Sequence, residues 1–195
     1  MRASLLALLV SLPLLSACRA PLRAPGATET VQTVYVVRHA ERLDASGDPP
    51  LSAAGEARAR ALADSLGRWG VPSASFATRF VRAQRTATLG APALVPQRYD
   101  RSPDAAADAR ALAASVLAGE AGPGTVLIVG HSNTVPSVLN GFDGGARPDL
   151  SERDYDGVYV VRIHRRGAPG QAPSVVRVDV QRRRIGTDDG VPDPR

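Results

Sequence analysis

The chain contains a single cysteine among its 195 residues and no lysine at all. One cysteine excludes an internal disulfide framework and a metal site built from several thiolates. All 24 basic residues are therefore arginine, and apart from Arg182–Arg184 they are scattered, with no nucleic-acid-binding motif beside them. The formal net charge of +5 thus indicates a preference for anionic ligands at most, and nucleic acid is not an expected partner.

The chain also lacks an apolar run of the roughly 20 residues that a membrane-spanning helix needs. Its longest run, Leu5–Leu15, follows Arg2, a pattern typical of a secretory signal peptide. The run ends in Leu15-Ser16-Ala17-Cys18, which resembles the lipobox of bacterial lipoproteins. This resemblance implies cleavage before Cys18 and lipid attachment at that residue. An ordinary secretory signal with an incidental cysteine is the alternative.

The residue after Cys18 is Arg19 and not Asp. By analogy with lipoprotein sorting in bacteria with two membranes, this favours an outer-membrane anchor with the domain facing the periplasm. The stretch that follows is rich in Pro, Ala and Gly without apolar periodicity, as in a flexible tether. We therefore expect a signal peptide over residues 1–17, a tether over 18–30, one folded domain over 31–182 and a polar C-terminal tail over 183–195.

Two apolar runs each end abruptly in a histidine. Val34–Val37 leads into Arg38 and His39, and Thr125–Gly130 leads into His131. Unbroken β-branched runs predict strands buried on both faces, and ligands bind outside the carboxyl ends of such strands. An arginine adds a fork of donors that suits phosphate or carboxylate, and the helix expected after His131 has free amides that favour anions. The pattern indicates an anion-binding site; the alternative is two loops with surface charge.

The remaining pattern predicts an α/β domain. Apolar residues recur at helical spacing after the N-cap candidate Ser52, a second helix is expected to begin near Ser102, and the strand-like runs 158–164 and 175–180 are joined by a polar stretch. We expect a three-layer sandwich with a mostly parallel central sheet flanked by helices, and an antiparallel C-terminal hairpin at the edge. Shorter strands are expected at 73–77 and 94–99. His164, among arginines, is expected to be solvated.

Residues 78–87 form a loop entering a helix, with arginines at 79, 82 and 85. A three-residue repeat of arginine equally describes a basic helix face in solvent, and the spacing alone does not choose among the three.

Taken together, three motifs resemble the histidine phosphatase superfamily, which includes phosphoglycerate mutases, small phosphohistidine phosphatases and acid phosphatases. They are Val36-Val37-Arg38-His39-Ala40-Glu41, Arg82-Ala83 with Thr86-Ala87, and Val129-Gly130-His131-Ser132-Asn133-Thr134, in the family's order. The resemblance covers about Val34 to Val161. It implies a phosphatase that needs no cofactor and no metal and acts on a small phosphorylated substrate.

The resemblance also assigns roles. His39 is the expected nucleophile, with its second nitrogen held by a backbone carbonyl, and His131 supplies a further hydrogen bond to the phosphoryl group. Arg38 and Arg82 are expected to clamp the phosphoryl oxygens. Arg82 is the family's arginine because it alone stands directly before Ala83 and four residues before Thr86.

The chain departs from the family pattern at two places. Many members have Gly where Ala40 stands and Ser-Pro where Thr78-Arg79 stands, so a narrower pocket is expected. The general acid, which must protonate the leaving group, has no clear counterpart. Asp100, at an expected strand end, is the preferred candidate, and Glu41 is its rival.

Two other functions stay open. One is a non-catalytic phosphate-binding lipoprotein that keeps the pocket but lacks an acid. The other is a serine esterase, in which Ser132 would be the nucleophile and His164 its base, since Gly130–Thr134 partly resembles a nucleophile elbow.

Overall fold

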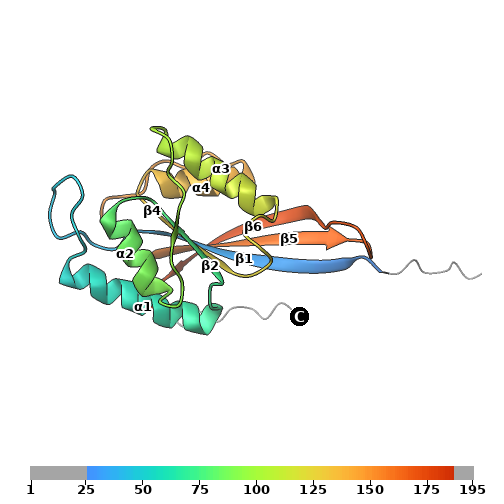
Figure 1. Cartoon of the computed structure of the whole chain (residues 1–195), viewed down its shortest axis with the longest axis horizontal. Coiled ribbons are helices and arrows are strands. Elements are labelled where there is room, and N and C mark those ends of the chain that lie inside the picture. The colour runs from blue at the N-terminus through green and yellow to red at the C-terminus, as the bar shows by residue number, and fades with distance from the viewer. Residues whose placement is uncertain (1–25, 187–195) are drawn as a thin grey trace, which may run out of the picture.

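A computed structural model of the protein describes residues 26–186, in which one sheet lies between two layers of helices (Figure 1). The strands are β1 (Thr28–Arg38), β2 (Ala74–Ala77), β3 (Gln97–Arg98), β4 (Val126–Gly130), β5 (Gly157–Gly167) and β6 (Ser174–Arg184). The helices are α1 (Ala53–Trp69), α2 (Val81–Gly90), α3 (Ala105–Leu117) and α4 (Thr134–Asp143).

The described strands form one sheet in the order β3-β2-β4-β1-β5-β6. The pairs β3–β2, β2–β4 and β4–β1 are parallel, whereas β5 runs antiparallel to both β1 and β6. The expected three-layer α/β sandwich and the antiparallel hairpin at the edge are therefore confirmed. Because β1 and β4 are parallel neighbours, their carboxyl ends lie side by side.

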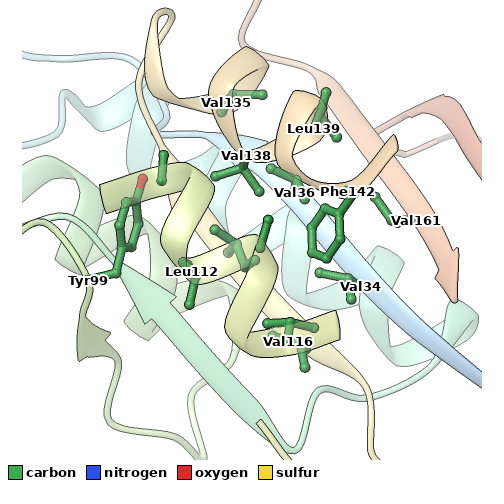
Figure 2. Close-up of a cluster of buried hydrophobic side chains, with 14 of the residues drawn as sticks. Val34, Val36, Tyr99, Leu112, Val116, Val135, Val138, Leu139, Phe142 and Val161 are labelled. Atoms are coloured by element: carbon green, nitrogen blue, oxygen red, sulfur yellow. The ribbon is translucent and has the colours of Figure 1, made fainter. Parts of the chain in front are cut away.

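Each face of the sheet is covered by its own pair of helices. On one face, alternate residues of β1 such as Val34 and Val36 pack against α3 and α4, around Leu112, Leu139 and Phe142 (Figure 2). On the other face, Tyr35 and Val37 pack against α1 and α2. The unbroken apolar sequence of β1 follows from this burial on both sides.

The helix α1 begins where the sequence predicts it. Ser52 is its N-cap, and the Ser52 hydroxyl accepts a hydrogen bond from the backbone N–H of Gly55 at 3.1 Å. Gly55 has no room for a side chain, because a Cβ there would lie 2.2 Å from the carbonyl oxygen of Glu41. The first turn of α1 is therefore pressed against the loop that follows β1.

Several expected boundaries are wrong. Thr28–Thr30, expected in the tether, belong to β1 because they pair with Arg165–Gly167 of β5. The expected tail begins too early, because β6 runs to Arg184 and pairs with β5 as far as Gly157. The strand expected at 94–99 is reduced to Gln97–Arg98, and the cap of α3 is Asp104, not Ser102.

The expected signal peptide, the lipidation site Cys18, and most of the expected tether and tail lie outside the described residues. Within residues 26–186, none of the helices combines the length and the apolar character required to cross a bilayer.

Candidate active site

The two strand-to-histidine junctions meet at one edge of the sheet. The backbone N–H of His39 donates to the carbonyl of Gly130 at 2.9 Å, and the ring centroids of His39 and His131 are 5.0 Å apart. Both rings line a cavity of about 490 Å³ that also receives arginines from β1 and α2. The cavity is lined by Arg38, His39, Arg42, Thr78, Arg79, Phe80, Arg82, Asp100, Ala105, His131, Ser132, Asn133, Thr134, Asp149 and Glu152.

His39 is held in one orientation by contacts at both ring nitrogens. Its Nδ1 lies 2.7 Å from the carbonyl oxygen of Ala40, which can only accept, so Nδ1 carries the proton. The Nε of Arg82 donates to His39 Nε2 at 3.2 Å, which requires a lone pair on Nε2. The ring is 3% exposed and is neutral in this arrangement. A neutral imidazole with its Nε2 lone pair beside a cationic cavity is the form that a nucleophile requires.

His131 is fixed by the segment that precedes α2. The hydroxyl of Thr78 lies 2.7 Å from His131 Nε2, and the ring of Phe80 meets the imidazole edge-on with centroids 4.9 Å apart. At the backbone, the N–H of His131 donates to the hydroxyl of Thr134 at 2.8 Å, at the start of α4. Two segments, the one that precedes α2 and the start of α4, therefore determine where this second imidazole lies.

Arg82 reaches the cavity from the first turn of α2. Its side chain is 12% exposed and pairs with Asp48 at 3.3 Å. Thr86, one turn later, accepts from the backbone N–H of Ala40 at 3.1 Å and donates to the carbonyl of Arg82 at 2.8 Å. The Thr86 hydroxyl thus connects α2 to the loop that carries His39. This contact is a physical reason for the threonine that stands four residues after the arginine in the motif.

Arg38 is almost fully buried behind the histidines. Its guanidinium donates to the carbonyl of Ser151 at 2.8 Å and to the carboxylate of Glu152 at 3.0 Å, and it lies 4.3 Å from the ring centroid of Tyr155. Its Nε is buried and has no hydrogen-bond partner within residues 26–186. A buried donor without a partner is costly and is uncommon in proteins, so an anion within reach of it would be stabilised.

Burial keeps both imidazoles neutral. Desolvation is the largest cause that lowers the pKa of His39 to about 4, with a smaller contribution from Arg82 and Arg38 against the opposing hydrogen bond to Ala40. Desolvation, followed by the charge of His39, lowers the pKa of His131 to about 3. Positive charge is thus supplied by guanidiniums, while the imidazoles retain their lone pairs.

Sequence comparison identifies the same region. Residues 34–104 match the family model of the histidine phosphatase superfamily (branch 1), and this range includes His39, Arg38 and Arg82. Over this stretch the chain is similar to the histidine phosphatase superfamily. No curated protein matches its sequence.

Solved structures share the histidine phosphatase fold with this chain. The protein histidine phosphatase SixA complexed with tungstate is 19% identical, with a TM-score of 0.52 over 75% of this chain and 95% of that one. A structure named mycobacterial hydrolase 2 is 18% identical, with a TM-score of 0.53 over 82% and 94%. A putative phosphohistidine phosphatase SixA from Agrobacterium tumefaciens is 19% identical, with a TM-score of 0.50 over 79% and 97%. At these identities, the likeness establishes the fold.

Of the two general-acid candidates, Asp100 and Glu41, only Asp100 lines the cavity. Asp100 is 1% exposed and accepts from the backbone N–H of Arg79 at 2.7 Å and from Nε of Arg98 at 3.1 Å. Glu41 is instead turned towards α1, where Arg58 binds it through two nitrogens, at 2.6 and 2.8 Å. Burial is the largest single influence and pushes the pKa of Glu41 upward, but the hydrogen bonds from Arg58 and from its own backbone N–H, together with the charges of Arg58 and Arg38, leave that pKa lowered.

The loop after α4 brings two further carboxylates that sequence analysis did not single out. Asp149 and Glu152 both line the cavity, and Glu152 bonds Arg38 as well as the hydroxyl of Ser132 at 3.3 Å. The positive charge of Arg38 lowers the pKa of Glu152. The Gly- and Asp-rich composition of residues 140–155 indicated a loop bordering the pocket, but it carried no signal for these two side chains.

The two departures from the family pattern have different consequences. The methyl group of Ala40 is buried against Leu51 and Ala59 and does not line the cavity. Arg79 does line it, with its guanidinium 4.9 Å from the ring centroid of Phe80. The expected narrowing by Ala40 is therefore wrong, whereas the side chain of Arg79 occupies the rim.

The serine esterase alternative lacks its base. Ser132 bonds Glu152, whereas His164 lies on β5 between Glu29 at 3.3 Å and Asp179 at 3.0 Å. His164 is also 8% exposed, so the expectation that it is solvated is wrong. It is buried because cross-strand carboxylates surround it.

Within residues 26–186, no cluster of three or more His, Cys, Asp or Glu side chains could hold a metal ion.

Proposed function

We propose that the protein is a phosphomonoesterase that forms a phosphohistidine on His39. The observation that carries the proposal is the state of that ring: its Nδ1 proton is committed to Ala40, and its Nε2 lone pair lies beside Arg82 and the second imidazole. A phosphate ester resists attack because its oxygens are anionic. Guanidiniums around it offset that charge and hold the phosphorus near the nucleophile.

In the first step, Nε2 of His39 attacks phosphorus, a P–N bond forms and the P–O bond to the leaving group breaks. Arg38 and Arg82 bind the phosphoryl oxygens, and His131 adds a hydrogen bond to the same group. In the second step, water attacks phosphorus, the P–N bond breaks, and inorganic phosphate and neutral His39 are released. The covalent intermediate divides one difficult displacement into two easier ones. None of these steps draws on a metal ion.

Asp100 is our candidate for the proton donor to the leaving oxygen and the base for the attacking water. Its burial in the cavity wall supports this role, while the donors already bound to its carboxylate oppose it. If Asp100 does not transfer protons, an aryl phosphate, whose leaving group needs no proton, will still react. An alkyl phosphate will react poorly.

The ion pairs that the cavity carboxylates make with arginines also favour a second candidate function, that of a protein that binds phosphate without turning over an ester. In the cavity wall, Asp100 bonds Arg98 and Glu152 bonds Arg38, so two of the possible acids are held in ion pairs. Such a protein would bind inorganic phosphate in the same cavity and would release no product from any ester.

We further propose that Cys18 is lipidated and anchors the domain to a bacterial envelope membrane, on the outer membrane facing the periplasm. Support comes from the lipobox-like Leu15–Cys18 and from the position of Thr28, where the first strand of the domain begins. The 11 residues of β1 separate Thr28 from the site, a distance of about 35 Å at roughly 3.3 Å per residue. An anchor upstream of Thr28 would leave the cavity accessible. Cys18→Ala is expected to release the protein from the membrane fraction.

The test of the catalytic proposal is a panel of aryl and alkyl phosphates, with the full chain and with His39→Ala. A phosphatase releases inorganic phosphate, is inhibited by vanadate and loses activity in the variant. Phosphate binding without turnover by the unmodified protein would favour the binding protein. Full activity of His39→Ala with sensitivity to serine-directed reagents would favour the esterase.

A further inference from the structure

A second cavity lies on the face of the sheet that carries α1, beyond the point where that helix ends. β1, β5 and β6 continue past the helices (Figure 1), and α1 stops at Trp69. The cavity has a volume of about 180 Å³ and lies among Tyr35, Trp69, Val160, Arg162 and Arg183. None of its lining residues also lines the catalytic cavity.

Arg183 is buried there and has no carboxylate partner among residues 26–186. It is 8% exposed, and its Nη1 is buried with no hydrogen-bond partner. Arg182 and Arg184, its neighbours on β6, point to the opposite face of the sheet, because side chains alternate along a strand. Each of them pairs with a carboxylate: Arg182 with Asp154 at 2.8 Å, and Arg184 with Asp156 at 2.9 Å. Of these three consecutive arginines, therefore, the one facing the cavity is the one without an acidic partner in the described part of the chain.

Arg162 on β5 faces the same cavity and has no carboxylate partner within residues 26–186. The acid opposite it across the β5–β6 pair, Asp179, is already bound by His164 at 3.0 Å and by Arg177 at 3.2 Å. Burial raises the pKa of Tyr35, and the charges of Arg183 and Arg162 both oppose this, so both guanidiniums lie near the phenol. Two like charges beside one small cavity are unfavourable unless an anion lies between them.

Apart from Thr33, the other residues that line the cavity are apolar or aromatic. The ring of Trp69 lies 6.3 Å from that of Tyr35 and 5.3 Å from the guanidinium carbon of Arg183. A cavity of about 150 Å³ is large enough to hold a benzene ring, so 180 Å³ accommodates a ring with one small polar substituent. We propose that this cavity binds a small aromatic carboxylate, with its ring on Trp69 and Tyr35 and its carboxylate between Arg183 and Arg162. This site does not depend on the proposed phosphatase chemistry.

The experiment uses Trp69 as the reporter, because it is the only tryptophan in the chain. Tryptophan emission of the full chain is followed while benzoate is added, and benzamide, which has the same shape without the charge, is the matched ligand. We expect a saturable change with benzoate and a much weaker one with benzamide. Arg183→Gln should weaken benzoate binding on the order of tenfold to a hundredfold, because a charged hydrogen-bond donor is lost.

Arg182→Gln removes the same charge one residue away on the opposite face and should leave the benzoate affinity unchanged. Should Arg183→Gln fail to fold, Arg162→Gln, which alters a less buried arginine, gives the decisive comparison. A linear, non-saturable quench, equal responses to benzoate and benzamide, or equal affinities in Arg162→Gln and the unmodified protein would each overturn the proposal.

Discussion

Acidification to about pH 5 should destabilise this protein through two imidazoles of the cavity, the buried His39 and the half-buried His131. Both are neutral in the folded state, with a pKa of about 4 for His39 and about 3 for His131, whereas an unfolded histidine has a pKa near 6.5. Between these values the unfolded chain binds more protons than the folded one. Stability is therefore fully present above pH 6.5 and is lost as the pH falls towards 4.

The size of the loss follows from the linkage. At about pH 5 an unfolded histidine is almost fully protonated, while both folded imidazoles remain neutral, so each contributes a loss of about 2 kcal/mol and the pair about 4 kcal/mol. The result depends little on the folded pKa values, because pH 5 lies above both. Since a domain of this size has a free energy of unfolding of about 5–15 kcal/mol, the loss is a large share of the total.

The assay is urea unfolding at about pH 7 and pH 5, followed by the emission of Trp69. The control is the double variant His39→Gln/His131→Gln, which keeps every carboxylate and His164 but lacks the two imidazoles of the cavity. The unmodified protein should lose about 4 kcal/mol more than the control between the two pH values. Equal losses in the two proteins would refute the conclusion that both imidazoles are neutral in the folded protein.

Three further predictions concern single residues. Arg82→Lys keeps the charge but not the fork and should lower kcat/KM at least about 10²-fold, whereas Arg85→Lys, on the same helix but outside the cavity, should have little effect. Asp100→Asn should lower alkyl phosphate turnover about 10²-fold and aryl phosphate turnover far less; equal losses would indicate a structural role. Gly55→Ala should lower the free energy of unfolding by about 1–3 kcal/mol, because its Cβ would lie 2.2 Å from a carbonyl oxygen, while Gly67→Ala, with open space around it, should not destabilise α1.

The parts of the fold that sequence patterns predicted are those with a strong local signal. The apolar runs of β1 and β4 have no polar alternation because helices cover both faces, and α1 has a capping serine and a regular apolar face. These segments could be placed without knowledge of their partners. The histidines at the strand ends followed from the general position of ligand sites in such sheets.

The errors occur where distant residues decide the structure. Thr28–Thr30 are polar and look like tether, but hydrogen bonds to β5 make them strand. His164 is surrounded by arginines in sequence, yet it is buried because Glu29 and Asp179 lie on the strands to either side. Glu152 reaches Arg38 from 114 residues away on a loop without periodicity, so no local pattern could indicate it.

The most direct test of the account is to trap the phosphoryl group. The full chain is mixed with an aryl phosphate, quenched rapidly under alkaline conditions that preserve phosphohistidine, and the modified residue is identified by mass spectrometry. The account predicts one phosphoryl group on His39, formed and lost at rates that support turnover, and none in His39→Ala. A phosphoryl group on another side chain, or undiminished turnover by His39→Ala, would contradict it.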